Sequence, residues 1–114
     1  MKKLVAVPCF NEEDNIDSCI ESLLNLKNEK IEEFDILVVN DGSKDDTHKK
    51  LSQFGNLINV ISSKQNFGLS EVFNSILYFS KEENYDQLVI FDSDNQYPYE
   101  DIPKLFEKIS SEEL

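Results

Sequence analysis

Two carboxylates in the segment 91–96, which reads FDSDNQ, have the spacing of a cation site. Asp92 and Asp94 directly follow an apolar run, and alternate residues that leave a strand project to the same side. Mg²⁺ and Mn²⁺ prefer oxygen ligands, and Mg²⁺ typically combines one or two carboxylates with water and phosphate oxygens. Acidic pairs also occur in ordinary helix caps and solvated loops. The position of this pair after a buried strand, together with two further polar turns, favours a divalent cation site.

A second polar turn, Asp41-Gly42-Ser43, follows the apolar segment 34–39. It is typical of a turn that leads into a helix, and Asp46 lies in near capping-box spacing from Ser43. A carboxylate held in this turn can also accept hydrogen bonds from a nucleobase or a ribose. The sequence contains neither GxGxxG nor GxxxxGK[ST], so the glycine-rich phosphate cradles of other nucleotide-binding folds lack their main signature.

The elements that must position these turns can be read from the apolar pattern. Short apolar segments predict four strands, at residues 3–8, 34–39, 57–62 and 87–91. Helical spacing of apolar residues predicts helices between and after them, at residues 12–24, 45–54, 69–77 and from residue 100 or 101 onward. The first of these helices is predicted to be capped by Asn11, with Glu12, Glu13 and Asp14 in its first turn.

Continuous apolar strands that alternate with helices predict an α/β fold. The expected sheet is Rossmann-like and mostly parallel, with about four strands, right-handed crossovers and helices on both faces. In an open parallel sheet, ligands bind beyond the carboxyl ends of the strands. The polar turns after residues 8, 40 and 91 are therefore expected to meet at one edge of the sheet.

The overall charge of the chain limits the classes of partner that it can bind. Lys and Arg total 11 against 23 Asp and Glu, which gives a formal net charge of -12. A surface of this sign repels phosphate backbones, so we expect no nucleic-acid partner. A diphosphate that enters a carboxylate-rich site needs a cation or basic groups to bind favourably. With 114 residues, of which 39% are hydrophobic, residues 1–114 are expected to form a single folded domain.

Four segments together resemble the family 2 inverting glycosyltransferases of the GT-A fold. They are residues 7–13 (VPCFNEE), 38–47 (VVNDGSKDDT), 66–70 (NFGLS) and 91–98 (FDSDNQYP). Their order and spacing match the family across nearly the whole chain. The last segment, followed by EDIP, is similar to members that glycosylate polyprenyl or dolichyl phosphate.

The resemblance implies a nucleotide-diphosphate sugar of UDP or GDP type as the ligand. It implies transfer of the sugar, with inversion, to a polyprenyl phosphate or a saccharide. The implied nucleotide-binding residues are Pro8, Phe10, Glu12, Asp41 and Asp92, and the implied ligands of Mg²⁺ or Mn²⁺ are Asp92, Asp94 and Gln96. A catalytic base for hydroxyl acceptors is expected beyond Leu114, whereas a phosphate acceptor is already ionised.

The chain departs from the family pattern at several positions. Asn40 stands where many relatives have a second acidic residue, and it keeps hydrogen-bonding capacity. Glu71, Val72 and Phe73 replace small residues that many relatives carry after the glycine of the third segment. Relatives also continue well beyond the length of this chain. We therefore expect a truncated GT-A sheet, inactive by itself, that self-associates through an uncovered sheet edge.

The N-terminal apolar run is too short for a signal peptide or a membrane span. Cys9 and Cys19 lack CxxC spacing and are expected to be reduced and buried. These features predict a cytoplasmic location for this portion, and the resemblance adds a parent protein at the cytoplasmic face of a membrane.

Two other interpretations remain open on these residues. A sugar-nucleotide nucleotidyltransferase shares a similar sheet and an acidic metal site, but its first strand normally leads into a glycine-rich, basic loop, where this chain has Asn11-Glu12-Glu13. A non-catalytic, response-regulator-like α/β interaction domain also places carboxylates at strand ends. No suitably placed C-terminal lysine after a fifth strand is found in the sequence to support it.

Overall fold

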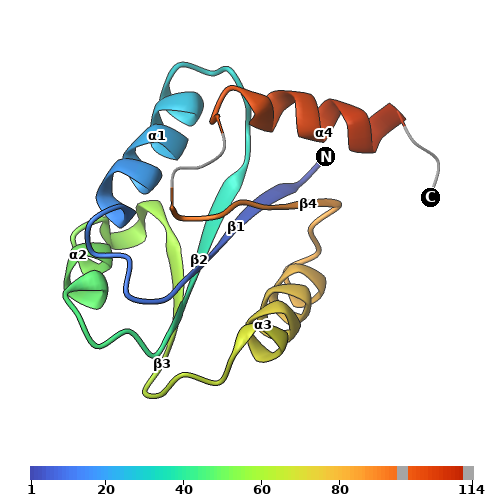
Figure 1. The fold of residues 1–114 in the computed structure, drawn as a ribbon. Helices are drawn as coiled ribbons and strands as arrows, with labels where there is room; N and C mark the ends of the chain where they lie inside the picture. Colours follow the sequence, from blue (N-terminus) through green and yellow to red (C-terminus); the bar gives the residue numbers. More distant parts are fainter. Residues whose placement is uncertain (95–97, 112–114) are drawn as a thin grey trace.

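Strands and helices alternate along the chain (Figure 1). The structure is a computed structural model, and it describes residues 1–94 and 98–111. Its elements are β1 (Lys3–Cys9), α1 (Ile16–Asn28), β2 (Asp35–Asp41), α2 (Thr47–Ser52), a 3₁₀ helix (Gly55–Leu57), β3 (Asn59–Ser63), α3 (Leu69–Glu82), β4 (Gln87–Ile90) and α4 (Asp101–Ser111).

The sheet is parallel throughout the described residues. The strand order is β3-β2-β1-β4, and each neighbouring pair runs in the same direction. In this register Ala6 of β1 lies between Leu37 of β2 and Ile90 of β4. The carboxyl ends of the four strands therefore lie along one edge. The predicted α/β fold with a four-stranded parallel sheet is confirmed.

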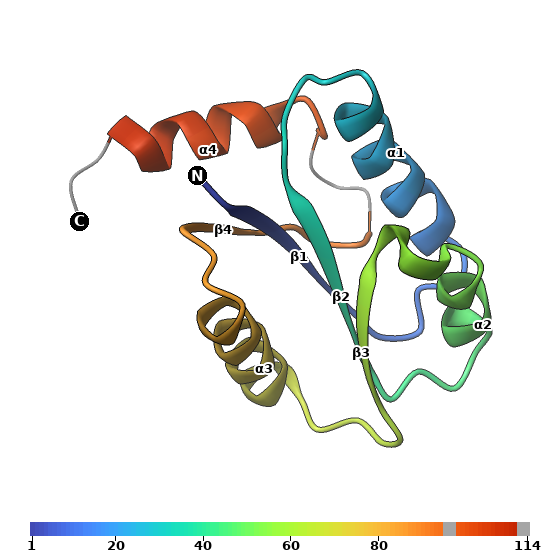
Figure 2. The same cartoon turned by 180° about the vertical axis from the view of Figure 1, so that it is seen from behind.

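Each face of the sheet carries an apolar layer. Side chains alternate along β1, so Val5 and Val7 join the core formed with α1, α2 and α4, whereas Leu4 and Ala6 join the core formed with α3. Figure 2 shows α3 on one side of the sheet and α1, α2 and α4 on the other. Each fully buried aliphatic side chain of this kind contributes about 1.5–3 kcal/mol to stability. These two layers hold the strand ends in place.

The α3 side of the sheet is the less covered of the two. Helix α3 buries Val72 and Ile76 against the strands. Leu69, Phe73 and Leu77, which follow one another at four-residue spacing, keep exposed fractions of 62%, 37% and 56%. We call these three residues the α3 apolar stripe. A soluble chain seldom leaves a row of large apolar side chains exposed without a binding role.

The predicted start of the first helix is wrong. Helix α1 begins at Ile16, and Asn15 occupies its N-cap without a side-chain capping bond. Asn11, the predicted cap, has a φ of 52° and accepts the Lys44 N–H on its side-chain oxygen at 2.8 Å. The N–H groups of residues 11–13 donate to the loop after β2 and to the first residue of α2. Contacts between the two loops therefore override the helical pattern of this segment.

Among the other boundaries that differ from the prediction are the starts of the third strand and of the second helix. Leu57, the predicted first residue of the third strand, belongs to the 3₁₀ helix, and β3 begins at Asn59. Helix α2 begins at Thr47 instead of residue 45. The reason is that the Asp45 carboxylate accepts the Thr47 N–H at 3.0 Å, which forms a side-chain turn before the helix.

Gly42 allows the loop after β2 to lie directly against the loop before α3. Its φ is 73°, and a Cβ built on it would lie 2.3 Å from the carbonyl carbon of Gln65 and 2.4 Å from the Asn66 nitrogen. A side chain at this position can be accommodated only if the backbone of residues 65–66 moves. Gly55 also has a positive φ, of 56°, but a Cβ there would meet nothing within 4 Å.

Gly42→Ala is therefore expected to destabilise the chain more than Gly55→Ala. Both changes place a side chain in the left-handed region, at a cost of about 1–2 kcal/mol. Gly42→Ala adds a backbone collision, for which about 1–3 kcal/mol more is expected. Urea unfolding followed by circular dichroism measures both free energies of unfolding. Equal midpoints for the two variants would contradict the close approach of these loops.

Candidate functional site

A cleft of about 460 Å³ opens at the carboxyl edge of the sheet. Such a volume falls in the range of small-molecule sites. Its walls come from the ends of β1, β2 and β4 and from the start of α3, and the described lining residues are Pro8, Cys9, Phe10, Glu12, Asp41, Asn66, Gly68, Leu69, Val72, Asp92, Ser93 and Asp94. The polar turns that the sequence places after three strands thus meet in one cleft.

Asp41 ties the end of β2 to the start of α3. Its side chain is 6% exposed. Its carboxylate accepts the Phe67 N–H at 2.9 Å and the Gly68 N–H at 3.0 Å. The Ser63 hydroxyl lies 3.3 Å from Oδ1, but its one hydrogen also reaches the Gln65 carbonyl, at 3.0 Å. Each carboxylate oxygen therefore accepts one backbone N–H and keeps capacity for a ligand.

The loop after β1 turns its backbone donors away from the cleft. The N–H groups of residues 11–13 donate in order to Ser43 Oγ at 2.9 Å, Thr47 Oγ1 at 3.0 Å and Asp45 Oδ2 at 3.2 Å. In other nucleotide-binding proteins, successive N–H groups of this kind form concave sites for phosphate. Here they are occupied by two side chains of the loop after β2 and by Thr47, the first residue of α2. A diphosphate in the cleft must find its compensating charge elsewhere.

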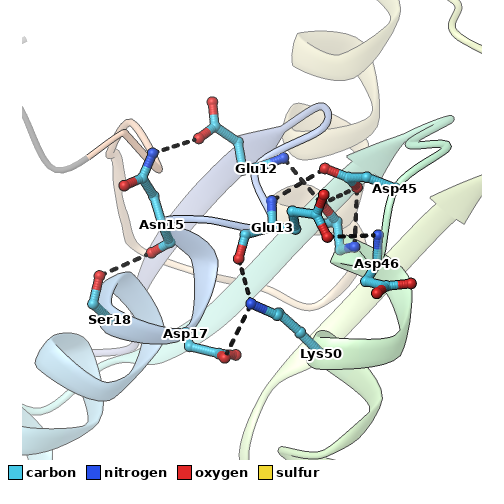
Figure 3. Close-up of polar contacts among 9 residues, drawn as sticks. Glu12, Glu13, Asn15, Asp17, Ser18, Asp45, Asp46 and Lys50 are labelled. Carbon is cyan, nitrogen blue, oxygen red and sulfur yellow. Dashed lines mark hydrogen bonds and ion pairs between the residues drawn. The ribbon is translucent and has the colours of Figure 1, made fainter.

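A lysine completes the contact between the two loops, as Figure 3 shows. Lys50 Nζ donates to the Glu13 carbonyl at 2.6 Å and lies 3.7 Å from Asp17 Oδ2. The Glu13 carboxylate accepts the Asp46 N–H at 3.4 Å. Desolvation raises the pKa of Asp45, but hydrogen bonds from Thr47 and from the Glu13 N–H lower it more, so its pKa lies below the usual value. Asp45 is therefore an ionised acceptor at neutral pH.

The cleft itself is acidic. Its described lining holds the carboxylates of Glu12, Asp41, Asp92 and Asp94 and contains no Lys or Arg. Within residues 1–94 and 98–111, no three His, Cys, Asp or Glu side chains are grouped closely enough to hold a metal ion. A cation here would depend on Asp92 and Asp94 and on oxygens of water and ligand. That set of hard oxygen donors fits Mg²⁺ or Mn²⁺.

Six of the site residues predicted from the sequence lie together in the cleft. Pro8, Phe10, Glu12, Asp41, Asp92 and Asp94 all line the cleft. Gln96, the third predicted metal ligand, lies outside the described residues.

The other described residues of the cleft received no role from the sequence. They are Cys9, Asn66, Gly68, Leu69, Val72 and Ser93. Asn66 belongs to the NFGLS segment, which was the available signal. Cys9 also lines the cleft, but burial, followed by the nearby Glu12, raises the pKa of its thiol to about 12. The thiol is protonated at neutral pH and is a poor nucleophile.

Two sugar transferases are similar to this chain over nearly its whole length. The dolichol-phosphate mannosyltransferase of Pyrococcus furiosus is 34% identical over 116 residues, which cover 97% of this chain and 31% of that protein. The undecaprenyl-phosphate 4-deoxy-4-formamido-L-arabinose transferase of Proteus mirabilis is 27% identical over 108 residues, which cover 91% of this chain and 32% of that protein. The chain thus spans about a third of the length of these two relatives.

A solved structure shares the fold. It is the glucosyl-3-phosphoglycerate synthase of Mycobacterium tuberculosis in complex with Mn²⁺, UDP and glucosyl-3-phosphoglycerate. It is similar with a TM-score of 0.76 and 25% identity, over 98% of this chain and 40% of that one. Residues 4–114 match the family described as Glycosyl transferase family 2. Because this match covers nearly the whole chain, the protein belongs to glycosyl transferase family 2, as the four sequence segments predicted.

Proposed function

We propose that this chain binds a nucleotide-diphosphate sugar, together with Mg²⁺ or Mn²⁺, in the cleft at the carboxyl edge of the sheet. The observation that carries the proposal is the convergence of Glu12, Asp41, Asp92 and Asp94 on that cleft. The parent enzyme would transfer the sugar, with inversion, to a polyprenyl phosphate or a saccharide. Support comes from the names of the two transferases and from the UDP and Mn²⁺ in the synthase complex.

The nucleoside would occupy the part of the cleft between the ends of β1 and β2. Phe10 is 43% exposed there, so its ring is available to pack against a base. Pro8 and Glu12 would form the adjoining wall. Asp41 would accept a hydrogen bond from the base on its carboxylate, since each of its oxygens accepts one backbone N–H and has a further lone pair. UDP is the nucleotide we favour over GDP, because UDP occupies the similar synthase.

The diphosphate would lie near the end of β4, where Asp92 and Asp94, together with Gln96, would hold the cation. A bound cation supplies the positive charge that the described lining lacks, and it stabilises the charge that grows on the departing nucleoside diphosphate. Asp92 would also contact the ribose or the diphosphate. We assign no catalytic base within the cleft, because a phosphate acceptor is already ionised and a hydroxyl acceptor would need a base beyond Leu114.

We place this portion of the parent protein on the cytoplasmic side. Cys9 and Cys19 are free and buried, which fits a reducing compartment. Across the described residues, none of the helices combines the length and the apolar character that crossing a membrane requires. Attachment of the parent enzyme to a membrane is proposed from the lipid-phosphate names of its relatives.

Calorimetric titration of UDP into the chain is expected to show saturable binding in the presence of Mn²⁺. Removing the metal with a chelator should weaken binding by roughly tenfold or more, because the carboxylates then repel the diphosphate. Asp92→Asn and Asp94→Asn should each weaken the Mn²⁺-dependent binding by a similar factor. GDP, titrated in the same way, tests the choice of nucleotide.

Glu107→Gln is the matched control, because it removes one charge at an exposed position of α4 outside the cleft. It should bind UDP as the wild type does. Binding of the same strength with and without Mn²⁺, or no binding of UDP or GDP by the wild type, would overturn the proposed function. Equal losses in Glu107→Gln and Asp94→Asn would show that only the net charge matters.

We also propose that the chain self-associates on its less covered side, through the α3 apolar stripe and the adjacent edge of the sheet. Leu77 is 56% exposed in the stripe, and Ile90 of the edge strand β4 is 43% exposed. Burying such side chains against a second copy is favourable, and an open edge strand offers unpaired backbone groups.

Sedimentation velocity should show the average mass of the wild type rising with protein concentration. Leu77→Lys is expected to reduce this rise, since a charged group in the stripe opposes burial. Leu105→Lys, at a 40% exposed position of α4, is the matched control and should associate like the wild type. A wild-type chain that stays monomeric at every concentration would contradict the proposal.

A further inference from the structure

The Thr47 hydroxyl connects the two loops behind the cleft. Thr47 is fully buried, with 0% of its surface exposed. Its Oγ1 accepts the Glu12 N–H at 3.0 Å and donates its hydrogen to Asp45 Oδ1 at 2.5 Å. The Thr47 hydroxyl therefore uses both its hydrogen and one of its lone pairs in hydrogen bonds, and these two bonds fix its orientation.

Asp45 makes this contact rigid. The carboxylate of Asp45 receives the Thr47 hydroxyl on Oδ1. It also receives the Glu13 N–H on Oδ2, at 3.2 Å (Figure 3). Two consecutive N–H groups of the loop after β1 are thus held by one hydroxyl and one carboxylate. Hydrogen bonds to an ionised acceptor are stronger than those between neutral groups.

Glu12 is the residue through which this contact reaches the cleft. The Glu12 side chain lines the cleft, whereas Thr47 does not. The Glu12 carbonyl accepts the Ile16 N–H at 2.8 Å, so the backbone of Glu12 also fixes where α1 begins. Asn15 Nδ2 donates to Glu12 Oε2 at 3.2 Å, which directs the carboxylate itself. The position of this carboxylate therefore depends on where the Glu12 backbone is held.

We infer that Thr47 is a positioning residue for nucleotide binding, which acts by fixing the Glu12 backbone at the edge of the cleft. The inference rests on the proposed function, because it assigns Thr47 to the same nucleotide site. Thr47 touches no ligand in this scheme. Its effect passes from its hydroxyl to the Glu12 N–H, and from there to the Glu12 carboxylate at the wall of the cleft.

The competing role for Thr47 is purely local. Thr47 is the first residue of α2, and its N–H donates to Asp45 Oδ1, so it also helps to start that helix. A residue with this role alone would change the stability of the chain and leave the affinity of the folded chain for nucleotide unchanged. Affinity and stability therefore separate the two roles.

The test compares Thr47→Val, which keeps the shape and removes the hydroxyl, with Thr47→Ser, which keeps the hydroxyl. Ser52→Ala is the matched control, since it removes a hydroxyl of α2 that donates to the Lys49 carbonyl at the surface. UDP affinity is measured by calorimetry with Mn²⁺ at a temperature where all variants are folded by circular dichroism. Thr47→Val should bind UDP roughly tenfold more weakly, and Thr47→Ser and Ser52→Ala should bind like the wild type.

A second measurement examines the contact without a ligand. Amide hydrogen exchange of the free chain by NMR should show faster exchange of the Glu12 amide in Thr47→Val, by roughly tenfold, and wild-type exchange in Thr47→Ser. An unchanged Glu12 amide in Thr47→Val would overturn the inference. So would UDP binding by Thr47→Val at wild-type strength, which would leave the proposed function standing. Absence of UDP binding by the wild type would overturn the proposed function and this inference with it.

Discussion

The common direction of the four strands is the constraint from which the site follows. Because β1, β2 and β4 end at the same edge, Glu12, Asp41 and Asp92 reach one cleft although they are far apart in the sequence. Apolar layers on both faces hold the strands, with Val5 and Val7 on one side and Leu4 and Ala6 on the other. Stability resides in these layers, and the polar groups are gathered at the edge where open parallel sheets bind ligands.

The turns at that edge are held by hydrogen bonds, and because of these bonds we expect the proposed nucleotide site to need a cation. Side chains of the loop after β2 and of Thr47 receive the N–H groups of residues 11–13, and the Asp41 carboxylate receives those of Phe67 and Gly68. The same bonds that fix the loops remove the backbone donors that hold phosphate in glycine-rich sites. Since the described lining also lacks Lys and Arg, the acidity of the cleft and its expected metal dependence have one origin.

The order of the strands and helices could be predicted because burial and periodicity are local patterns. The meeting of the polar turns in one cleft could be predicted from their places after strands, whereas the nucleotide and metal roles of single residues came from the family resemblance. The start of α1 could not be predicted from the sequence, because it depends on a hydrogen bond between Glu12 and Thr47, which are 35 positions apart. The positioning role inferred for Thr47 could not be predicted from the sequence for the same reason. The nucleotidyltransferase and response-regulator interpretations also place carboxylates at strand ends, so the fold alone does not exclude them. The match to glycosyl transferase family 2 does.

In the function proposed above, one cation held at Asp92 and Asp94 joins the nucleotide to this edge of the sheet. Paramagnetic broadening of backbone amide signals by Mn²⁺ in the presence of UDP tests it most directly, because the effect falls steeply with distance from the ion. We predict the strongest broadening at residues 92–94, with weaker effects at Glu12 and Asp41. Broadening centred away from the cleft, for example on α4, or spread evenly over the chain, would contradict a cation held at Asp92 and Asp94.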